Sequence, residues 1–279
     1  MERSGFIPRG ETAYPIAGNV NSTEFYFVLL PKVTMLALSA AIEPLRIANQ
    51  IAEQELFRWF TVSLDGETIE CSNGIHVSAN MSIAEVPRRA SAFICSGTEP
   101  EETLNAKIVH WSRRHIAFGG SIGGICTGAF TLAEAGLLEG RKFTLHWENQ
   151  ASFTERFHSL VPSPNLFEND AGVMTCGGGI AGVDMMLSLI EEKHGRDLAI
   201  VVSDMCIHQR SHSQHTSQMT ATTAAIGSRN QKLLSAVELM EKNIENPLPL
   251  KKIASLSGVS MRQLERLFNK YTDETPGSY

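Results

Sequence analysis

The sequence predicts an α/β domain with a mostly parallel sheet, followed by a small all-α unit. Between residues 24 and 207, apolar runs of strand length alternate with stretches of helical periodicity, which is typical of an α/β layered domain. The apolar runs are nearly continuous, as expected of parallel strands that are covered on both faces. Beyond residue 230 only short amphipathic stretches remain, and these predict helices.

Size and charge exclude several classes of protein. A length of 279 residues allows one large domain and a small one, and 43% hydrophobic residues are ordinary for a folded globular protein. The net charge of −6 argues against a protein that coats nucleic acid over its whole surface, although a small basic module at one end is compatible with it. No apolar stretch approaches the roughly 20 residues of a membrane span, so we expect no membrane partner.

The N-terminal segment and the cysteines point to a cytoplasmic protein. Residues 1–23 have no apolar core of the signal-peptide type and are rich in Gly, Pro, Asn and Ser, which predicts a flexible tail. The five cysteines are odd in number, widely spaced and free of any CxxC pair. They indicate neither a disulfide framework nor a zinc site, and we expect no metal and no cofactor.

The first half of the α/β domain contains three predicted strands and one long helix. The helix begins after Thr34, a plausible N-cap, and carries Leu38, Ile42 and Leu45 at helical spacing. Turn signals at Gly66 and Gly74 lead into a short extended piece. In chain order the predicted elements are a strand at Glu24–Pro31, the helix at Thr34–Asn49, a strand at Phe57–Leu64, the extended piece at Ile75–Val77 and a strand at Ser91–Cys95.

The second half continues the alternation. Asn169-Asp170-Ala171-Gly172 is a strong turn signal between two short apolar runs and predicts a hairpin. Three glycines, Gly177 to Gly179, then open a helix. The predicted elements are a helix from Glu101 to Gly119, strands at Ser121–Ile125 and Phe143–Leu145, the hairpin of Leu166–Glu168 with Val173–Cys176, a helix carrying Val183 to Ile190 and a last helix at Asp197–Ile207.

A glycine-flanked cysteine lies at the centre of this domain. Gly124-Ile125-Cys126-Thr127-Gly128 has the pattern of a sharp strand-to-helix turn that exposes a nucleophile, because side chains on either flank would obstruct such a turn. A helix N-terminus would lower the pKa of the Cys126 thiol. The alternative is that Cys126 is a small buried core residue, and the two interpretations are close to balance with a lean toward the exposed turn.

Polar and small residues follow three of the predicted strands. Ligands in parallel α/β sheets bind beyond the carboxyl ends of the strands. Ser96-Gly97, Cys126 and His146 all fall at such ends. The sequence therefore predicts a site at this edge of the sheet.

The α/β domain is followed by a polar segment without periodicity. Residues 208–230 are dominated by Ser, His, Gln and Thr, which predicts a linker. His208, His212 and His215 could suggest a metal site, but no Cys, Asp or Glu lies in register with them. We favour solvated linker residues over metal ligands.

The C-terminal region, residues 231–279, has the form of a helix-turn-helix. Short amphipathic helices are predicted at Leu233–Asn243, Leu250–Ser257 and Met261–Lys270, with a turn at Gly258-Val259. Ser260 caps the last helix, which presents Arg262, Gln263 and Arg266 outward, residue types that reach base edges or phosphates. The alternative is a helix pair that serves only for packing.

Three stretches in this order resemble one family. They are IGGICTGAFTLAEAGLLEGRKFTLHW, TCGGGIAGVDMMLSLI and PLPLKKIASLSGVSMRQLERLFNKYTDETPGSY, and the resemblance covers roughly residues 24 to 279. The chain is similar to the GlxA-type subgroup of AraC family transcriptional regulators. This resemblance implies a flavodoxin-like, doubly wound sensor domain of the PfpI or class I amidotransferase type at 24–207, and an AraC-type DNA-binding domain at 231–279.

The resemblance also implies that the catalytic machinery is incomplete. Cys126 and His146 match the cysteine and histidine of catalytic relatives, whereas the acidic position corresponds to Ala37, with Glu43 two turns later. Alanine cannot replace the carboxylate that poises such a thiol, so we expect a degenerate site. AraC-type domains contain two helix-turn-helix units, and Tyr279 follows the first, which we interpret as a truncation.

The resulting hypothesis is a DNA-binding regulator, expected to be a homodimer, whose sensor domain binds a small-molecule effector. A Trp beside a carboxylate would suit a quaternary amine or a basic amino acid. The expected effector-binding residues are Glu43, Gly97, Cys126, Thr127, His146 and Trp147, and the expected DNA-binding residues are Ser260, Arg262, Gln263 and Arg266.

Two other functions remain open from the sequence. One is a cysteine-dependent hydrolase, hydratase or glyoxalase-like enzyme, in which Cys126 attacks a carbonyl, His146 transfers protons, and the N–H groups of Thr127 and Gly97 hold the oxyanion. The other is a module for oligomerisation or partner binding only.

Overall fold

The computed structural model describes residues 10–16, 18, 20–208, 218, 231–243, 247–271 and 275–277. The chain divides into two compact units, Met1–Gln218 and Met219–Tyr279. Among the described residues, no helix is long and apolar enough to cross a membrane.

The first unit is built on a seven-stranded sheet. Its order is β5-β2-β1-β6-β7-β9-β8, and every neighbouring pair is parallel except β8 with β9. This arrangement confirms the predicted mostly parallel α/β sheet. The strands are β1 (Thr23–Leu29), β2 (Phe57–Ser63), β5 (Met81–Ser82), β6 (Ser91–Cys95), β7 (Ser121–Ile125), β8 (Phe167–Asp170) and β9 (Val173–Cys176), and a separate small hairpin pairs β3 (Ile69–Glu70) with β4 (His76–Val77).

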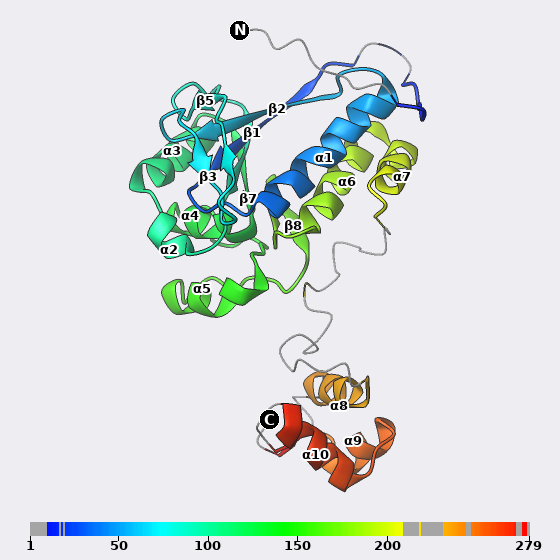
Figure 1. Cartoon of the computed structure of the whole chain (residues 1–279). Coiled ribbons are helices and arrows are strands. Elements are labelled where there is room, and N and C mark those ends of the chain that lie inside the picture. The colour runs from blue at the N-terminus through cyan, green and yellow to red at the C-terminus, as the bar shows by residue number, and fades with distance from the viewer. Residues whose placement is uncertain are drawn as a thin grey trace. The chain divides into compact units, whose positions relative to one another are not determined.

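Helices cover both faces of this sheet (Figure 1). One apolar cluster joins α1, α6 and α7 to one face, and a second cluster joins α3, α4 and α5 to the other. The helices are α1 (Met35–Ala52), α2 (Pro100–Thr103), α3 (Ala106–Ala117), α4 (Ala129–Glu134), α5 (Gln150–Arg156), α6 (Ala181–His194) and α7 (Arg196–Met205), with single 3₁₀ turns η1 (Cys126–Gly128) and η2 (Trp147–Asn149).

Two predicted elements differ from the structure. The helix expected from Glu101 to Gly119 is two helices, because Leu104 is extended and the side chain of Asn105 accepts a hydrogen bond from the Lys107 N–H, which starts a new helix. The expected strand at Phe143–Leu145 does not join the sheet. The Thr144 N–H donates to the side-chain hydroxyl of Thr175 in β9 and not to a backbone carbonyl of that strand.

Part of the expected N-terminal tail is packed. The Tyr14 N–H donates to the Ile51 carbonyl over 2.7 Å, and Tyr14, Ile16 and Val20 lie against the core formed with α1. The Gln54 side chain also donates to the Ile16 carbonyl. Apolar side chains at 14, 16 and 20 therefore hold a segment that was expected to be flexible, while residues 1–9 lie outside the described part of the chain.

The described part of the second unit contains three helices, α8 (Gln231–Lys242), α9 (Leu250–Leu256) and α10 (Met261–Tyr271). Their buried face consists of Leu233, Ala236, Val237, Ile253, Ala254, Leu264, Leu267 and Phe268. Gly258 adopts a φ of 67° in the turn between α9 and α10, a conformation that favours glycine. The helix, short glycine turn and helix predicted from the sequence are all present.

Candidate functional site

The turn after β7 has the strained backbone of an elbow. Cys126 has a φ of 59°, a value that few residues other than glycine adopt. Gly128 lies so close to β6 that an added Cβ would collide with the Ile94 carbonyl oxygen. The glycine after the cysteine is therefore required by close packing, as the pattern predicted.

The thiol at this elbow is buried. Cys126 is 4% exposed, and a Cβ placed on Gly178 would lie 2.9 Å from its Sγ. The loop that opens α6 thus closes over the thiol from one side. The prediction of an exposed cysteine was wrong, because the sequence does not show how closely the Gly178 loop approaches.

Burial sets the chemistry of the thiol. It raises the pKa of Cys126, and the negative charge of Glu148 acts in the same direction. Contacts with Thr34 and Thr127 lower the pKa but do not outweigh burial. Burial also raises the pKa of the neighbouring Cys176 thiol to about 12. The thiol is therefore protonated near neutral pH, contrary to the expected effect of the helix N-terminus.

His146 lies beside the elbow without engaging the thiol. Its backbone N–H donates to the Cys126 carbonyl over 3.4 Å, and its Nδ1 is 3.8 Å from the Glu148 carboxylate. Burial lowers the pKa of the His146 imidazole, partly offset by Glu148. Within the described chain, the imidazole makes no hydrogen bond to the Cys126 thiol. The two residues are close in the fold but do not form a nucleophile and base pair.

Ala37 occupies the position where the resemblance led us to expect the acid of catalytic relatives. Ala37 is fully buried in α1, where its carbonyl would lie 3.3 Å from a Cβ on Gly182 of α6. The absence of an acid at this position follows directly from the sequence.

Thr34 lies at the site beside Cys126, although the sequence predicted it only to cap the following helix. It occupies the N-cap position of α1, but its side chain makes no capping hydrogen bond. Its hydroxyl oxygen lies 4.0 Å from the Cys126 Sγ instead. The available signal was its position just beyond the carboxyl end of β1.

Gly97 and Thr127 join the loops after β6 and β7. The Thr127 hydroxyl donates to the Gly97 carbonyl over 2.6 Å, and both residues are close to Thr34 and Cys126. The structure thus brings together four of the expected effector-binding residues, Gly97, Cys126, Thr127 and His146. Trp147 follows directly, with its ring centroid 5.7 Å from that of His146.

Glu43 does not lie at this site. Six residues beyond Ala37, it is turned by about 240° around the helix. Its carboxylate pairs with Arg46 over 2.7 Å and contributes to the raised pKa of Cys206 near the end of α7. The carboxylate that accompanies Trp147 is Glu148, the next residue in the sequence.

A cavity of about 450 Å³ opens at the carboxyl edge of the sheet, beside the loop that leads to Thr34. Lys32 on its wall pairs with Glu99 and lies 3.4 Å from the Glu102 carboxylate. The cavity is lined by Leu29, Pro31, Lys32, Leu64, Asp65, Ile69, Glu102, Thr103, Leu104, Asn105 and Ile108.

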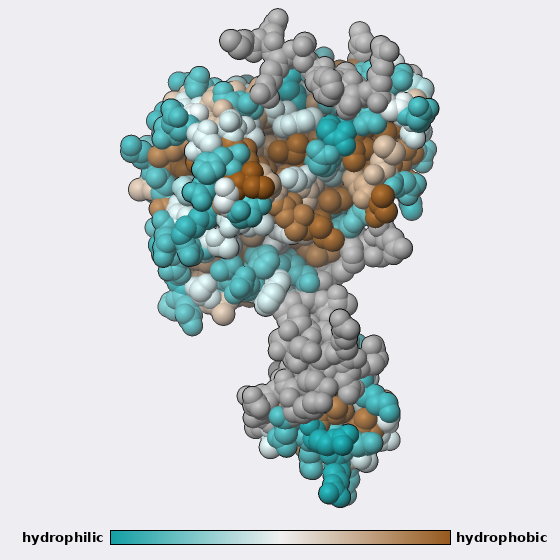
Figure 2. Space-filling view, viewed as in Figure 1, coloured by the Kyte–Doolittle hydropathy of each residue, from teal (hydrophilic) through white to brown (hydrophobic). Residues whose placement is uncertain are grey.

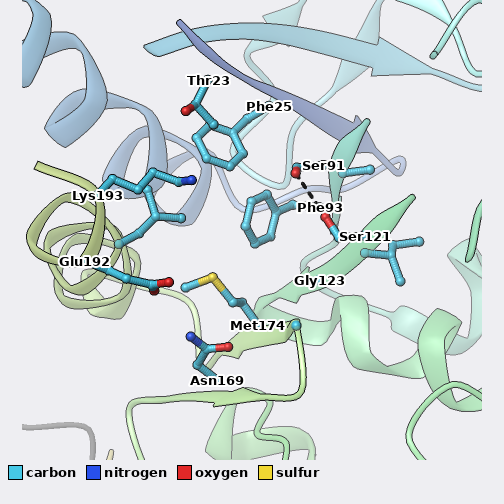
Figure 3. A pocket seen from close by; sticks show the side chains of 14 residues that line it. Thr23, Phe25, Ser91, Phe93, Ser121, Gly123, Asn169, Met174, Glu192 and Lys193 are labelled. Atoms are coloured by element: carbon cyan, nitrogen blue, oxygen red, sulfur yellow. Dashed lines mark hydrogen bonds between the residues drawn. The ribbon is translucent and has the colours of Figure 1, made fainter. Parts of the chain in front are cut away.

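A second cavity, of about 400 Å³, lies at the amino edge, between α6 and the first residues of β1, β6 and β7 (Figure 3). Phe25, Phe93 and Met174 contribute its apolar wall, and the Ser121 hydroxyl donates to the Ser91 hydroxyl over 3.0 Å. Figure 3 shows the side chains of Glu192 and Lys193 extending toward it from α6. This cavity is at the opposite end of the strands from Cys126.

Apolar surface is exposed where α1 and α6 begin. Leu36 and Ile180 are 57% and 56% exposed, and Figure 2 shows hydrophobic surface over this region. Both residues lie near the elbow, since Leu36 follows Thr34 by two residues and Ile180 follows Gly178 by two. Large exposed apolar side chains that gather in one place are typical of interaction surfaces.

The expected DNA-binding residues divide into two kinds. Ser260 and Gln263 form a capping box, in which the Gln263 N–H donates to the Ser260 hydroxyl and the Ser260 N–H donates to the Gln263 side chain. Their polar groups are engaged in starting α10. Arg262 and Arg266 are exposed and four residues apart, so they share one face of the helix.

The histidine cluster lies mostly outside the described residues. His212 and His215 are not described, and the His208 Nε2 is 3.0 Å from the buried Asp184 carboxylate of α6. Among the described residues, no group of three or more His, Cys, Asp or Glu side chains is placed to hold a metal ion.

This elbow and the sheet around it can be compared with known protein families. The family model described as the DJ-1/PfpI family matches residues 33–192, which include β1's following loop, the elbow and α6. The chain belongs to the DJ-1/PfpI family.

Several similar proteins are named as transcriptional regulators. The chain is 37% identical to the HTH-type transcriptional regulator GbdR of Pseudomonas aeruginosa over 94% of its own length and 71% of that protein. It is also 37% identical to the HTH-type transcriptional regulator GlxA of Rhizobium meliloti, over 88% of this chain and 76% of that one. A crystal structure of an AraC family transcriptional regulator from Pseudomonas putida superposes with a TM-score of 0.60 at 25% identity, covering 66% of this chain and 99% of that one. These relatives confirm the resemblance drawn from the motifs.

We predict that the thiol of the DJ-1/PfpI elbow alkylates slowly and in proportion to its small thiolate fraction. Because the folded pKa of Cys126 is raised, the rate should increase about tenfold per pH unit from 7 to 9 without a plateau. The same shift destabilises the fold as pH rises above the ordinary thiol pKa of about 8.5. Iodoacetamide labelling read by peptide mass, with Cys126→Ser as the control for site assignment, measures this rate. A plateau at or below pH 7 would show an activated thiolate and contradict the prediction.

Proposed function

We propose that this protein is a DNA-binding transcriptional regulator whose DJ-1/PfpI domain senses a small metabolite at the carboxyl edge of its sheet. The observation that carries the proposal is that one chain contains both a DJ-1/PfpI elbow and a helix-turn-helix. The elbow retains its close-packed geometry but has a buried, protonated thiol and no acid, and a helix-turn-helix follows it. The similarity to named regulators along most of the chain supports the same conclusion.

An enzymatic role receives little support from the site. A nucleophilic thiol needs a lowered pKa and a base within hydrogen-bonding distance. Cys126 has a raised pKa, and the His146 imidazole is not bonded to it. We therefore assign Cys126 and His146 to the wall of a sensor site and not to catalysis.

DNA binding should depend on the exposed arginines of α10. Replacing Arg262 and Arg266 together by Ala should weaken binding roughly tenfold or more and reduce the salt dependence by about one unit of slope per arginine that contacts phosphate. The measurement is fluorescence anisotropy on a labelled duplex, chosen from genomic fragments that the protein retains at low salt. Arg88→Ala in the first unit is the matched control. Equal affinity of the double variant and the wild type would overturn this assignment.

The effector proposed for the site is a small cation, a quaternary amine or a basic amino acid. Trp147 is 42% exposed and the Glu148 carboxylate is adjacent to it, so an aromatic face and a negative charge are available together. Calorimetry of the full chain with betaine, carnitine, choline and arginine should show binding of at least one, weakened roughly two- to thirtyfold by Trp147→Leu. If none of the four compounds gives a measurable heat of binding, the assignment of an amine effector is wrong.

The regulator is proposed to act as a homodimer through the apolar surface at Leu36 and Ile180. Placing a charge in a buried apolar contact is costly, so Leu36→Glu combined with Ile180→Glu should convert the dimer to a monomer. Sedimentation velocity distinguishes the two states. Val161→Glu changes a residue that is 77% exposed on another segment and is the control. A dimer that survives the double change must use another surface.

A further inference from the structure

A single glutamine from the segment expected to be a linker is built into the first unit. The Gln218 side-chain amide donates to the Thr144 hydroxyl and to the carbonyls of Leu145 and Asn165 over 2.8 to 2.9 Å. Its side-chain oxygen accepts the Trp147 N–H over 3.1 Å. Its own backbone N–H donates to the Pro164 carbonyl over 2.8 Å. We call this set of contacts the Gln218 anchor.

The surroundings allow only one orientation of this amide. Two carbonyls and a hydroxyl face the NH₂ group, and one N–H faces the oxygen, so a flipped amide would lose its contacts with the Leu145 and Asn165 carbonyls and with the Trp147 N–H. An added Cβ on Gly177 would collide with the end of the Gln218 side chain. Gly177 immediately precedes Gly178, which covers the Cys126 thiol. The anchor therefore lies directly behind the wall of the proposed sensor site.

The anchor joins a firmly held part of the fold to the loop that carries His146. Thr144 is fully buried, and the Asn165 side chain donates to the buried Glu168 carboxylate over 2.6 Å. On the other side, Leu145 and Trp147 are the two residues that flank His146. Because the amide bonds to both, it fixes the backbone on each side of the imidazole relative to Thr144 and Asn165.

Gln218 is also the last residue of the first compact unit. The chain continues from it toward the helix-turn-helix. A displacement of the His146–Trp147 loop therefore alters the hydrogen bonds that hold the chain at Gln218, where it leaves the sensor domain. By thermodynamic linkage, loss of these bonds at Gln218 also alters the loop.

We propose that Gln218 is a positioning residue that couples the sensor site to the DNA-binding unit. Occupation of the site by an effector displaces the His146–Trp147 loop, weakens the anchor and changes how firmly the chain is held at position 218. This inference rests on the proposed function for its biological meaning, but the coupling itself is a property of the first unit.

Amide hydrogen exchange in the full 279-residue chain tests the coupling in both directions. Gln218→Ala should speed exchange of the Trp147 N–H at least about tenfold, since its acceptor is lost. His146→Ala serves as a perturbation of the site and should speed exchange of the position 218 N–H several-fold. Unchanged exchange in either case overturns the proposal. Melting temperatures measured alongside show that each variant is folded.

Two further variants separate the anchor from general loosening. Gly177→Ala should reproduce the effect of Gln218→Ala by displacing the intact glutamine, and the two changes together should be no worse than either alone. Gln54→Ala removes a comparable side-chain bond, to the Ile16 carbonyl, and should leave both amides unaffected. Additive effects of Gly177→Ala and Gln218→Ala, or a response to Gln54→Ala, would contradict the proposal.

DNA binding distinguishes failure of the coupling from failure of the proposed function. If the wild type binds the labelled duplex, His146→Ala should change its affinity at least threefold, and this change should vanish in a Gln218→Ala background. If His146→Ala changes the DNA affinity equally in the Gln218→Ala background, the Gln218 anchor does not couple the sensor site to DNA binding. If the wild type binds no DNA, the proposed function fails, while the exchange measurements still decide whether the anchor couples position 218 to the site.

Discussion

The close approach of glycine-containing loops around Cys126 is the constraint on which the rest of the site depends. Gly128 meets the Ile94 carbonyl, and Gly178 meets the thiol itself. A side chain at Gly128 would push the turn after β7 away from β6, and one at Gly178 would push the loop after β9 away from that turn. The result is a thiol that is covered instead of displayed, so the same packing that preserves the elbow also raises its pKa.

Burial and the missing acid act together on the chemistry. In a buried site, a thiolate must be stabilised by a nearby charge or by strong donors to exist near neutral pH. Here the negative charge of Glu148 opposes ionisation of the thiol, and Ala37, at the position where an acid was expected in catalytic relatives, is fully buried and carries no charge. Restoring an acid alone would add another negative charge beside a covered thiol. The raised pKa of the Cys126 thiol is therefore a property of the whole environment and not of one position.

The sequence predicts those features that depend on neighbours along the chain. Strand-length apolar runs, the glycine pattern around Cys126 and the turn at Asn169 to Gly172 all signal their structure locally, and each is present. Features set by packing between distant segments were not predictable. The sequence does not show that Thr34 faces the thiol instead of capping α1, or that Phe143–Leu145 stays outside the sheet. For Glu43 the period of the helix was a usable signal, because six residues from Ala37 reach a different face.

Amino-acid composition does not predict the specific hydrogen bonds that a single residue of a polar segment makes. Residues 208–230 are polar and aperiodic, which predicts a linker, yet the two described residues of this range, His208 and Gln218, both bond to other residues of the first unit. A glutamine can do this without any apolar periodicity, because its amide offers donors and an acceptor to backbone groups that no strand or helix satisfies. The carbonyls of Leu145 and Asn165 and the Trp147 N–H are such groups, because all three lie outside the strands of the sheet. The backbone groups of the irregular loop beside His146 therefore obtain hydrogen-bond partners from the Gln218 amide.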